Sequence, residues 1–382
     1  MLNLVATYRQ FVPTVRISAA RFQSLLTNRN LDPSDVVERV TTAVAPDRLV
    51  VEDQDVDFAD VLALAKMFKR PWSYLLIDEA EAFPATGADN RTFGNQNVSL
   101  SPDLLGELQA ADLLLANAAE LAPDATFTVP TIVGAKPSAN DLGERTRTFL
   151  GISIDDQLAA KDDYAALRMW TSAIHNRGVY VAQRRLRDPS VRAFSKIAHE
   201  QALIVVDTGD APYARIFSAL HEYCHVTLRT TGICDLDDHS AIEQYCNAVA
   251  AEALLPGALL ARVVDTRALV TGDESADEAL GGFSRKLHVS QAVLLIRMRD
   301  LGLLTQDAYK NLESRRASRR KHGQKRGGTY YAPAINRVGR LFAHRALEAM
   351  TEGIIDRQDA SVMLSVGEHV IPRYLSELAK GD

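Results

Sequence analysis

The sequence has few cysteines, no long apolar run and no excess of basic charge. Three cysteines in 382 residues exclude a disulfide-stapled secreted scaffold. No apolar run approaches the roughly 18 residues of a membrane-spanning helix, and the N-terminal residues lack the pattern of a secretory signal. A net charge of −6 does not favour nucleic acid as a partner of the whole chain. We therefore expect a cytoplasmic protein in which any DNA contact is a local patch.

The composition that is present is typical of a folded chain. Apolar residues make up 47% and charged residues 24%, which argues against extensive disorder. This length predicts two or three domains. Breaker-rich segments that divide the chain lie at 83–101, 123–138 and 321–328.

Hydrophobic periodicity predicts a mixture of helices and a few strands. In the first 80 residues, helices are expected over 16–26, 36–44 and 57–68. In the middle of the chain, helices are expected over 138–150, 155–175, 212–229 and 240–255. Strands are expected over 179–182, 193–195 and 202–207. Residues 257–380 are predicted to be largely helical, with a helix pair inside 283–301.

The most informative pattern is His-Glu-x-x-His, formed by His221, Glu222 and His225 inside the helix predicted over 212–229. Residues four apart project from nearly the same face of a helix, so the two imidazoles can bind one Zn²⁺. Glu222 lies about 100° around the helix, where it can take a proton from a water on the metal. The competing interpretation is a pair of surface histidines beside a partly solvated glutamate.

A catalytic zinc site needs a third protein ligand and one open position. The extended pattern HExxHxxGxxH is excluded, because Leu228 and Thr231 occupy its glycine and third histidine positions. Glu243 is the favoured third ligand, since an antiparallel helix hairpin would return it to the metal. Asn247, one turn further on, could orient a ligand by a hydrogen bond. The other candidates are Asp235, Asp237, Asp238 and His239, and Glu243 could instead be a solvated carboxylate.

The run ARIFSALHEYCH…IEQYCNAVAAEALLP resembles the ImmA/IrrE metallopeptidases, in which an HExxH helix precedes a helix with E-x-x-x-N and an Ala-Ala-x-x-Leu-x-Pro ending. The resemblance covers roughly residues 57–380. It implies a gluzincin-like zinc site with His221, His225 and Glu243 as ligands and Glu222 as general base. It also implies an intracellular protease that cleaves a helix-turn-helix repressor, in a stress-response, mobile-element or toxin–antitoxin setting.

We therefore predict an α+β fold that is mostly helical, with a small-sheet zincin-like core. The expected parts are a helix-turn-helix-like domain at 1–82, a linker and connecting helix at 83–137, a metallopeptidase domain at 138–265 and a C-terminal helical domain at 266–382. Residues 1–90 contain nine Lys and Arg against 13 Asp and Glu, a net charge of −4. This acidity predicts an N-terminal domain that is weak or inactive on DNA, or that binds a protein partner.

Several other residues are candidates for supporting roles. An oxyanion donor would be Tyr331, Tyr330, His239 or Arg215, although the tyrosines also suit simple packing. A substrate could add as a strand beside residues 193–196 or 203–206, the second of which better fits an interior strand. Cys224 and Cys246 are expected to be small buried residues, or else a redox pair or extra ligands. Histidines outside the motif are expected to be mostly solvated.

A basic run is the only strong cationic patch in the sequence. It is either a solvated helix end or a contact for nucleic acid or an acidic partner. It motivates an alternative function, a non-catalytic DNA-binding or antitoxin-like regulator whose zinc fold is structural. The candidate nucleic-acid contacts are Arg315, Arg316, Arg319, Arg320 and Lys321.

Overall fold

A computed structural model describes most of the chain, namely residues 14–28, 31–37, 53–68, 75–76, 101–230, 232–235, 241–270, 274–318 and 331–379. The chain forms two compact units. The first comprises residues 1–91 and 95–106, and the second comprises residues 92–94 and 107–382.

The first unit combines short helices with a two-stranded antiparallel ladder. Strands β1 (Thr14–Ile17) and β2 (Gln54–Asp57) pair with each other. The helices are α1 (Ala19–Asn28), α2 (Pro33–Val37) and α4 (Phe58–Phe68). The rings of Phe22 and Phe68 meet edge to face in its core, with centroids 6.0 Å apart.

The ladder corrects the expectation that this region is purely helical. Residues 16 and 57 were predicted to begin helices, but each lies in a strand. Each strand has only four residues, too few for a two-residue periodicity to stand out from the adjoining helical pattern. Of the helix predicted over 36–44, the part after residue 37 lies outside the described residues. A helix-turn-helix in this region stays a prediction.

The second unit is built on a four-stranded sheet with the order β3-β5-β4-β6. Strand β3 is parallel to β5, while the other two pairings are antiparallel. All three predicted strands are present. The bounds are β3 (Val179–Arg184), β4 (Val191–Ala198), β5 (Gln201–Asp207) and β6 (Gly232–Asp235).

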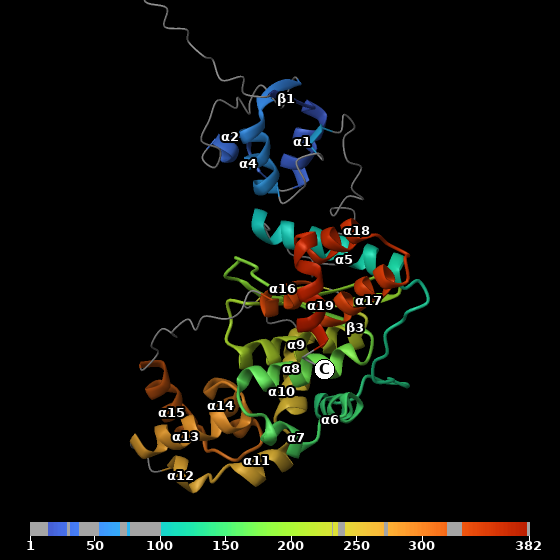
Figure 1. Cartoon of the computed structure of the whole chain (residues 1–382). Coiled ribbons are helices and arrows are strands. Elements are labelled where there is room, and N and C mark those ends of the chain that lie inside the picture. Colours follow the sequence, from blue (N-terminus) through green and yellow to red (C-terminus); the bar gives the residue numbers. More distant parts are fainter. Residues whose placement is uncertain are drawn as a thin grey trace, which may run out of the picture. The chain divides into compact units, whose positions relative to one another are not determined.

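Helices cover both faces of this sheet (Figure 1). One face packs against α8 (Asp163–His175) and α9 (Pro212–Thr227). On the other face, Tyr180 donates a hydrogen bond to Gln201 (2.7 Å), whose amide donates to Ala118 in α5 (Pro102–Leu121). The ring of Tyr180 also meets that of Phe342 in α17 (Arg340–Thr351). Burial on both sides explains why β5 is a continuous apolar run instead of an alternating one.

The remaining helices complete a mostly helical α+β fold, as predicted. Helices α12 to α15 gather near α7 and α11, and α16 to α19 lie with α5 (Figure 1). The bounds are α6 (Ala139–Leu150), α7 (Ile154–Ala159), α10 (Ala241–Leu254), α11 (Gly257–Val263), α12 (Arg267–Val270), α13 (Glu274–Leu287), α14 (Gln291–Asp300), α15 (Gln306–Ser318), α16 (Tyr331–Val338), α18 (Arg357–Leu364), a 3-10 turn (Glu368–Val370) and α19 (Ile371–Ala379).

One long helix predicted from the sequence is divided in two. The pattern over 155–175 becomes α7 and α8, separated at residues 160–162. The side chain of Asp162 accepts a hydrogen bond from the backbone N–H of Ala165 at 2.7 Å, and this N-cap starts a new helix. The helix pair predicted inside 283–301 is confirmed as α13 and α14.

Within the described residues, no single helix has the length and apolar character to cross a membrane. The bent pair α10 and α11 meets that test only when the two helices are taken together.

Candidate metal centre

Helix α9 carries the histidine motif near its C-terminal end. It begins at Pro212, which suits a first turn because the N–H it lacks would have no intrahelical partner. Its apolar side, including Ile216, Leu220 and Tyr223, packs into the core. The Tyr223 hydroxyl donates a hydrogen bond to the carbonyl of Thr128 at 3.3 Å. This packing fixes the rotation of the helix and therefore the direction of its histidines.

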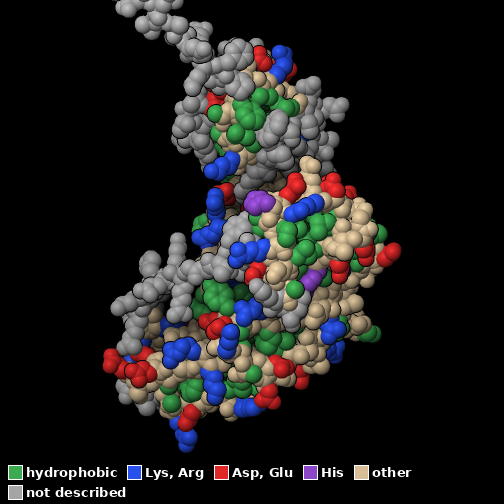
Figure 2. Space-filling model, viewed as in Figure 1, with side chains coloured by type: hydrophobic (Ala, Val, Ile, Leu, Met, Phe, Trp, Pro, Cys, Tyr) green, Lys and Arg blue, Asp and Glu red, His purple; other side chains and the backbone are tan. Residues whose placement is uncertain are grey.

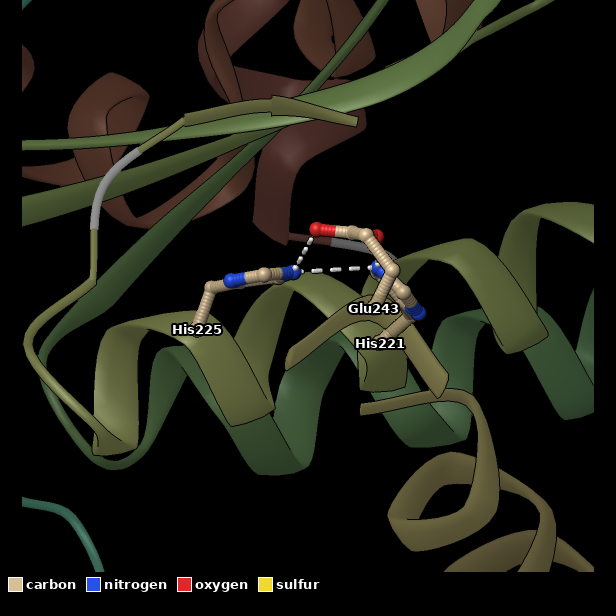
Figure 3. A group of neighbouring side chains, drawn as sticks. All are labelled: His221, His225 and Glu243. Carbon is tan, nitrogen blue, oxygen red and sulfur yellow. Dashed lines mark hydrogen bonds and ion pairs between the residues drawn. The ribbon is translucent and has the colours of Figure 1, made fainter. Parts of the chain in front are cut away.

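Three side chains from two helices converge on one point (Figure 3). His221 Nε2 lies 3.0 Å from Glu243 Oε2, and His225 Nε2 lies 3.1 Å from Glu243 Oε1. The two Nε2 atoms are 3.1 Å apart. Glu243 belongs to the first turn of α10, which packs against α9. The return of a second helix, proposed from the sequence, therefore brings the carboxylate to both rings.

This group has the donor set and spacing of a metal site. Within the described residues it is the one cluster of three or more potential ligands, and all three are buried. A tetrahedral ion with bonds of about 2.0–2.1 Å would separate its ligand atoms by about 3.3–3.4 Å. The observed separations of 3.0–3.1 Å need to open by only a few tenths of an ångström. The residues therefore fit a metal ion.

Two further side chains orient the imidazoles. Asn247 Oδ1 lies 3.0 Å from His221 Nδ1, and Thr230 Oγ1 lies 3.1 Å from His225 Nδ1. The Thr230 hydroxyl donates its proton to the carbonyl of His225, so its oxygen can accept a hydrogen bond from the N–H of the His225 ring. Each contact places the proton on Nδ1 and turns Nε2 toward the metal position. Asn247 was expected from the sequence, whereas Thr230 was missed because no helical spacing relates it to the motif.

Glu222 is fully buried, and its two oxygens lack a hydrogen-bond partner in the structure. Burial of a carboxylate without partners is costly, and such groups in native proteins commonly belong to functional sites. An orphaned carboxylate next to the two histidines fits a centre that is completed by a metal ion and water. Glu222 is not among the three residues whose ligand atoms lie together, so it is a candidate proton acceptor instead of a third ligand.

The charges of the cluster stabilise one another in the metal-free protein. Burial opposes ionisation of Glu243, but hydrogen bonds from His221 and His225 lower its pKa to about 2. Burial also opposes protonation of His225, but contacts with Cys246 and Glu243 raise its pKa to about 10. Because a metal ligand must be a neutral imidazole, metal binding competes with a proton on His225.

Other residues predicted for the site are placed elsewhere or lie outside the described residues. Arg215 donates hydrogen bonds to the carbonyls of Asp210 and Thr208 and to Gln183 Oε1, so it holds the turn before α9. Strand addition beside residues 193–196 or 203–206 is wrong, because β4 and β5 each have a partner strand on both sides. The structure does not describe Asp237, Asp238, His239 and Tyr330, nor the side chains of Asp235 and Tyr331.

The described part of the basic run is paired within the protein. Arg315 forms an ion pair with Asp277, and Arg316 with Glu313. Arg319, Arg320 and Lys321 lie outside the described residues. Among the coloured side chains of the second unit, Figure 2 shows positive and negative charges interspersed on the visible face.

The cysteines are buried next to the ligands. Cys224 and Cys246 are unpaired thiols in a small apolar cluster with Leu142 and Val249. A hydrogen bond with Cys224, together with burial, raises the pKa of Cys246. A protonated thiol is a poor nucleophile and metal ligand, so the packing interpretation fits best.

A sheet covered by helices, with two histidines and a glutamate converging beside an orphaned glutamate, defines a metallopeptidase-like domain. The comparison with known families agrees. Residues 175–299 match the IrrE N-terminal-like domain, a peptidase family. The family match covers this segment, and the resemblance proposed from the sequence is confirmed over these residues. No curated protein shows significant similarity to the chain.

Proposed function

We propose that this protein is a zinc-dependent endopeptidase that cleaves a helix-turn-helix transcriptional repressor in the cytoplasm, in a stress-response, mobile-element or toxin–antitoxin setting. The observation that carries the proposal is the buried convergence of His221, His225 and Glu243 next to the orphaned Glu222. The peptidase part is supported by the family match at residues 175–299. The repressor is supported by the resemblance to ImmA/IrrE metallopeptidases.

Two imidazole nitrogens and one carboxylate oxygen are a donor set that suits zinc. His221, His225 and Glu243 would hold the ion. When bound, zinc would lower the pKa of a coordinated water to about 7 and polarise the scissile carbonyl.

The other steps belong to the side chains of this protein. Glu222 accepts a proton from the attacking water at one of its two free oxygens and then delivers it to the leaving amine. Asn247 and Thr230 keep the imidazoles in the tautomer that presents Nε2. Tyr331 and His239 remain the proposed oxyanion donors.

The alternative is a non-catalytic DNA-binding or antitoxin-like regulator with a structural zinc fold. Structural zinc sites are normally closed by four protein ligands, whereas the described residues supply three. A structural site would also leave no role for Glu222. DNA remains a possible second partner through the basic run, but no described contact favours it.

The test compares the wild-type protein with Glu222→Gln and His221→Ala. Glu222→Gln preserves size and should retain one zinc per chain while it abolishes cleavage, because the amide cannot accept the proton. His221→Ala should lose both zinc and cleavage. Quantitative proteomics of cells that express each protein should show a repressor depleted only by the wild type. Zinc-loaded wild type without proteolysis would contradict the proposal, and activity in Glu222→Gln would refute the role of that residue.

A further inference from the structure

A cavity of about 720 Å³ lies beside the N-terminal half of α9. One wall is formed by α9 and by the end of α10, and the opposite wall by α13, α14 and the turn between them. None of the metal-site residues lines it. Its volume is within the range of about 300–1,000 Å³ that is typical of ligand-binding pockets.

On α9, the cavity wall and the metal ligands share one face. Ala214 and Ser218 line the cavity and precede His221 and His225, respectively, by seven residues. Seven residues turn a helix through about 700°, within about 20° of two full turns. Ala214 therefore lies on the same stripe as His221, and Ser218 on the same stripe as His225.

The same relation holds on α10. Leu254 lines the cavity and follows Glu243 by eleven residues, which is about 1,100° and within about 20° of three full turns. The metal cluster joins the C-terminal end of α9 to the N-terminal end of α10, and the cavity adjoins their opposite ends. The two helices pack together, so the cavity and the cluster lie at successive positions along the same helix pair.

Apolar groups line both walls of the cavity, beside serine, glutamine and charged side chains. Phe217 and Leu254 contribute apolar groups from one wall, and Leu280, Val289 and Val293 from the other. The charged lining residues all form ion pairs: Arg192 with Asp210, Asp277 with Arg315, and Arg316 with Glu313. Among the described lining residues, then, no charge would require an ion, and the apolar part of the lining can bury apolar surface of an occupant at about 25 cal/mol per Å².

The spacing favours a peptide over a separate small molecule. Ser218, which lines the cavity, precedes His221 by three residues, or about 4.5 Å along the helix axis. One residue of an extended peptide spans about 3.3–3.6 Å. A side chain about one residue from a bond held at the metal cluster would therefore reach the cavity.

We propose that this cavity is a specificity subsite that receives a large apolar side chain of the substrate next to the scissile bond. The inference rests on the proposed endopeptidase function. In this proposal, substrate selection is carried out by Ala214, Phe217 and Leu254 on one wall and by the α13–α14 hairpin on the other.

The experiment narrows the cavity from either wall. Ala214→Leu and Ala292→Leu each add bulk to a partly exposed lining position, and Ala261→Leu on exposed α11 is the matched control. Two peptide sets, identical except for a large or a small apolar residue next to the cut, are assayed for kcat/KM and for zinc content. Binding of the same peptides to each variant combined with Glu222→Gln provides a measurement that does not depend on turnover.

We expect each narrowed variant to keep its zinc and to lose roughly 10–200-fold in kcat/KM on the large-residue peptides. The small-residue peptides should change by less than threefold, and Ala261→Leu should behave as the wild type. Equal losses on both peptide sets, or no loss on either, would overturn the subsite and leave the peptidase proposal standing. If zinc-loaded wild type cleaves neither peptide set, the peptidase proposal fails. If neither narrowed variant changes peptide binding, the subsite is overturned whatever the cleavage result.

Discussion

The stability of the second unit should depend on pH through His175. This residue ends α8, and its Nε2 accepts a hydrogen bond from the backbone N–H of Val181 in β3 at 3.1 Å. Burial lowers its pKa from 6.5 to about 4, and the charges of Arg340 and His344 act in the same direction. Between about pH 4 and pH 6.5, the imidazole of His175 is therefore neutral in the folded protein and protonated in the unfolded chain.

The direction of the effect follows from proton binding. Between pH 6.5 and pH 4 the unfolded state binds more protons than the folded state, so acidification stabilises the unfolded state. The contribution of this residue is fully present above pH 6.5 and is lost as the pH falls toward 4. Between pH 7 and pH 5 the loss amounts to about 2 kcal/mol.

The assay is urea unfolding of metal-free protein at pH 7 and pH 5, for the wild type and for His175→Gln. Glutamine retains an acceptor for the Val181 N–H but does not titrate, so the change in unfolding free energy should be about 2 kcal/mol smaller in the variant. The metal ligands titrate equally in both proteins and drop out of the comparison. His369→Gln, at an exposed histidine, is the control and should match the wild type. Equal pH dependence in the wild type and His175→Gln would refute the reasoning.

Three other perturbations have defined outcomes. Asn247→Ala and Thr230→Val should each weaken zinc binding by about 10–100-fold, since each removes a group that orients a ligand; competition with a chelator measures this, and unchanged affinity would contradict it. Arg147→Met leaves three acceptors, on Ser153, Gln157 and Ala253, without their donor. Because each unsatisfied buried group costs about 1–3 kcal/mol, the variant should lower the free energy of unfolding by about 3 kcal/mol or more. A loss below about 1 kcal/mol in urea titration would argue against the network. Gly339→Ala should lower the stability by at least about 1–3 kcal/mol, because φ is 85° and a Cβ would lie 2.5 Å from a backbone oxygen. Gly302→Ala should lower it less, since φ is 69° there but no atom lies near the new Cβ. Thermal unfolding that ranks the two variants in reverse would exclude the contact.

The sequence predicted the centre of the fold well, because there local pattern and tertiary role agree. The apolar run of β5 and the Pro212 start of α9 are strong local signals. The four-residue spacing of His221 and His225 is enough to put both side chains on one face of a helix. The proximity of Glu243 followed from a single assumption, that the next long helix returns antiparallel.

The failures arose where a short local signal opposed a longer periodic one. The cap at Asp162 divides a helical pattern, and the strands of the first unit are too short to be distinguished. The expectation of solvated histidines was wrong for His288, which is buried with its Nδ1 2.8 Å from Asp163 Oδ1. Such a long-range partner leaves no mark in local spacing. Thr230 is only five residues from His225, but it follows the end of α9, where helical spacing no longer applies.

The position of β3 at the margin of the sheet limits how this protein can be divided. The residues that match the peptidase family end at 299, but α16 packs against β3, and the Gly339 position closely approaches the carbonyl of Val181. A fragment limited to the matched segment would lack α16 and would expose β3 to solvent. Exposed edge strands of this kind promote self-association. The smallest fragment of the second unit that folds on its own should therefore retain the C-terminal helices that cover this strand.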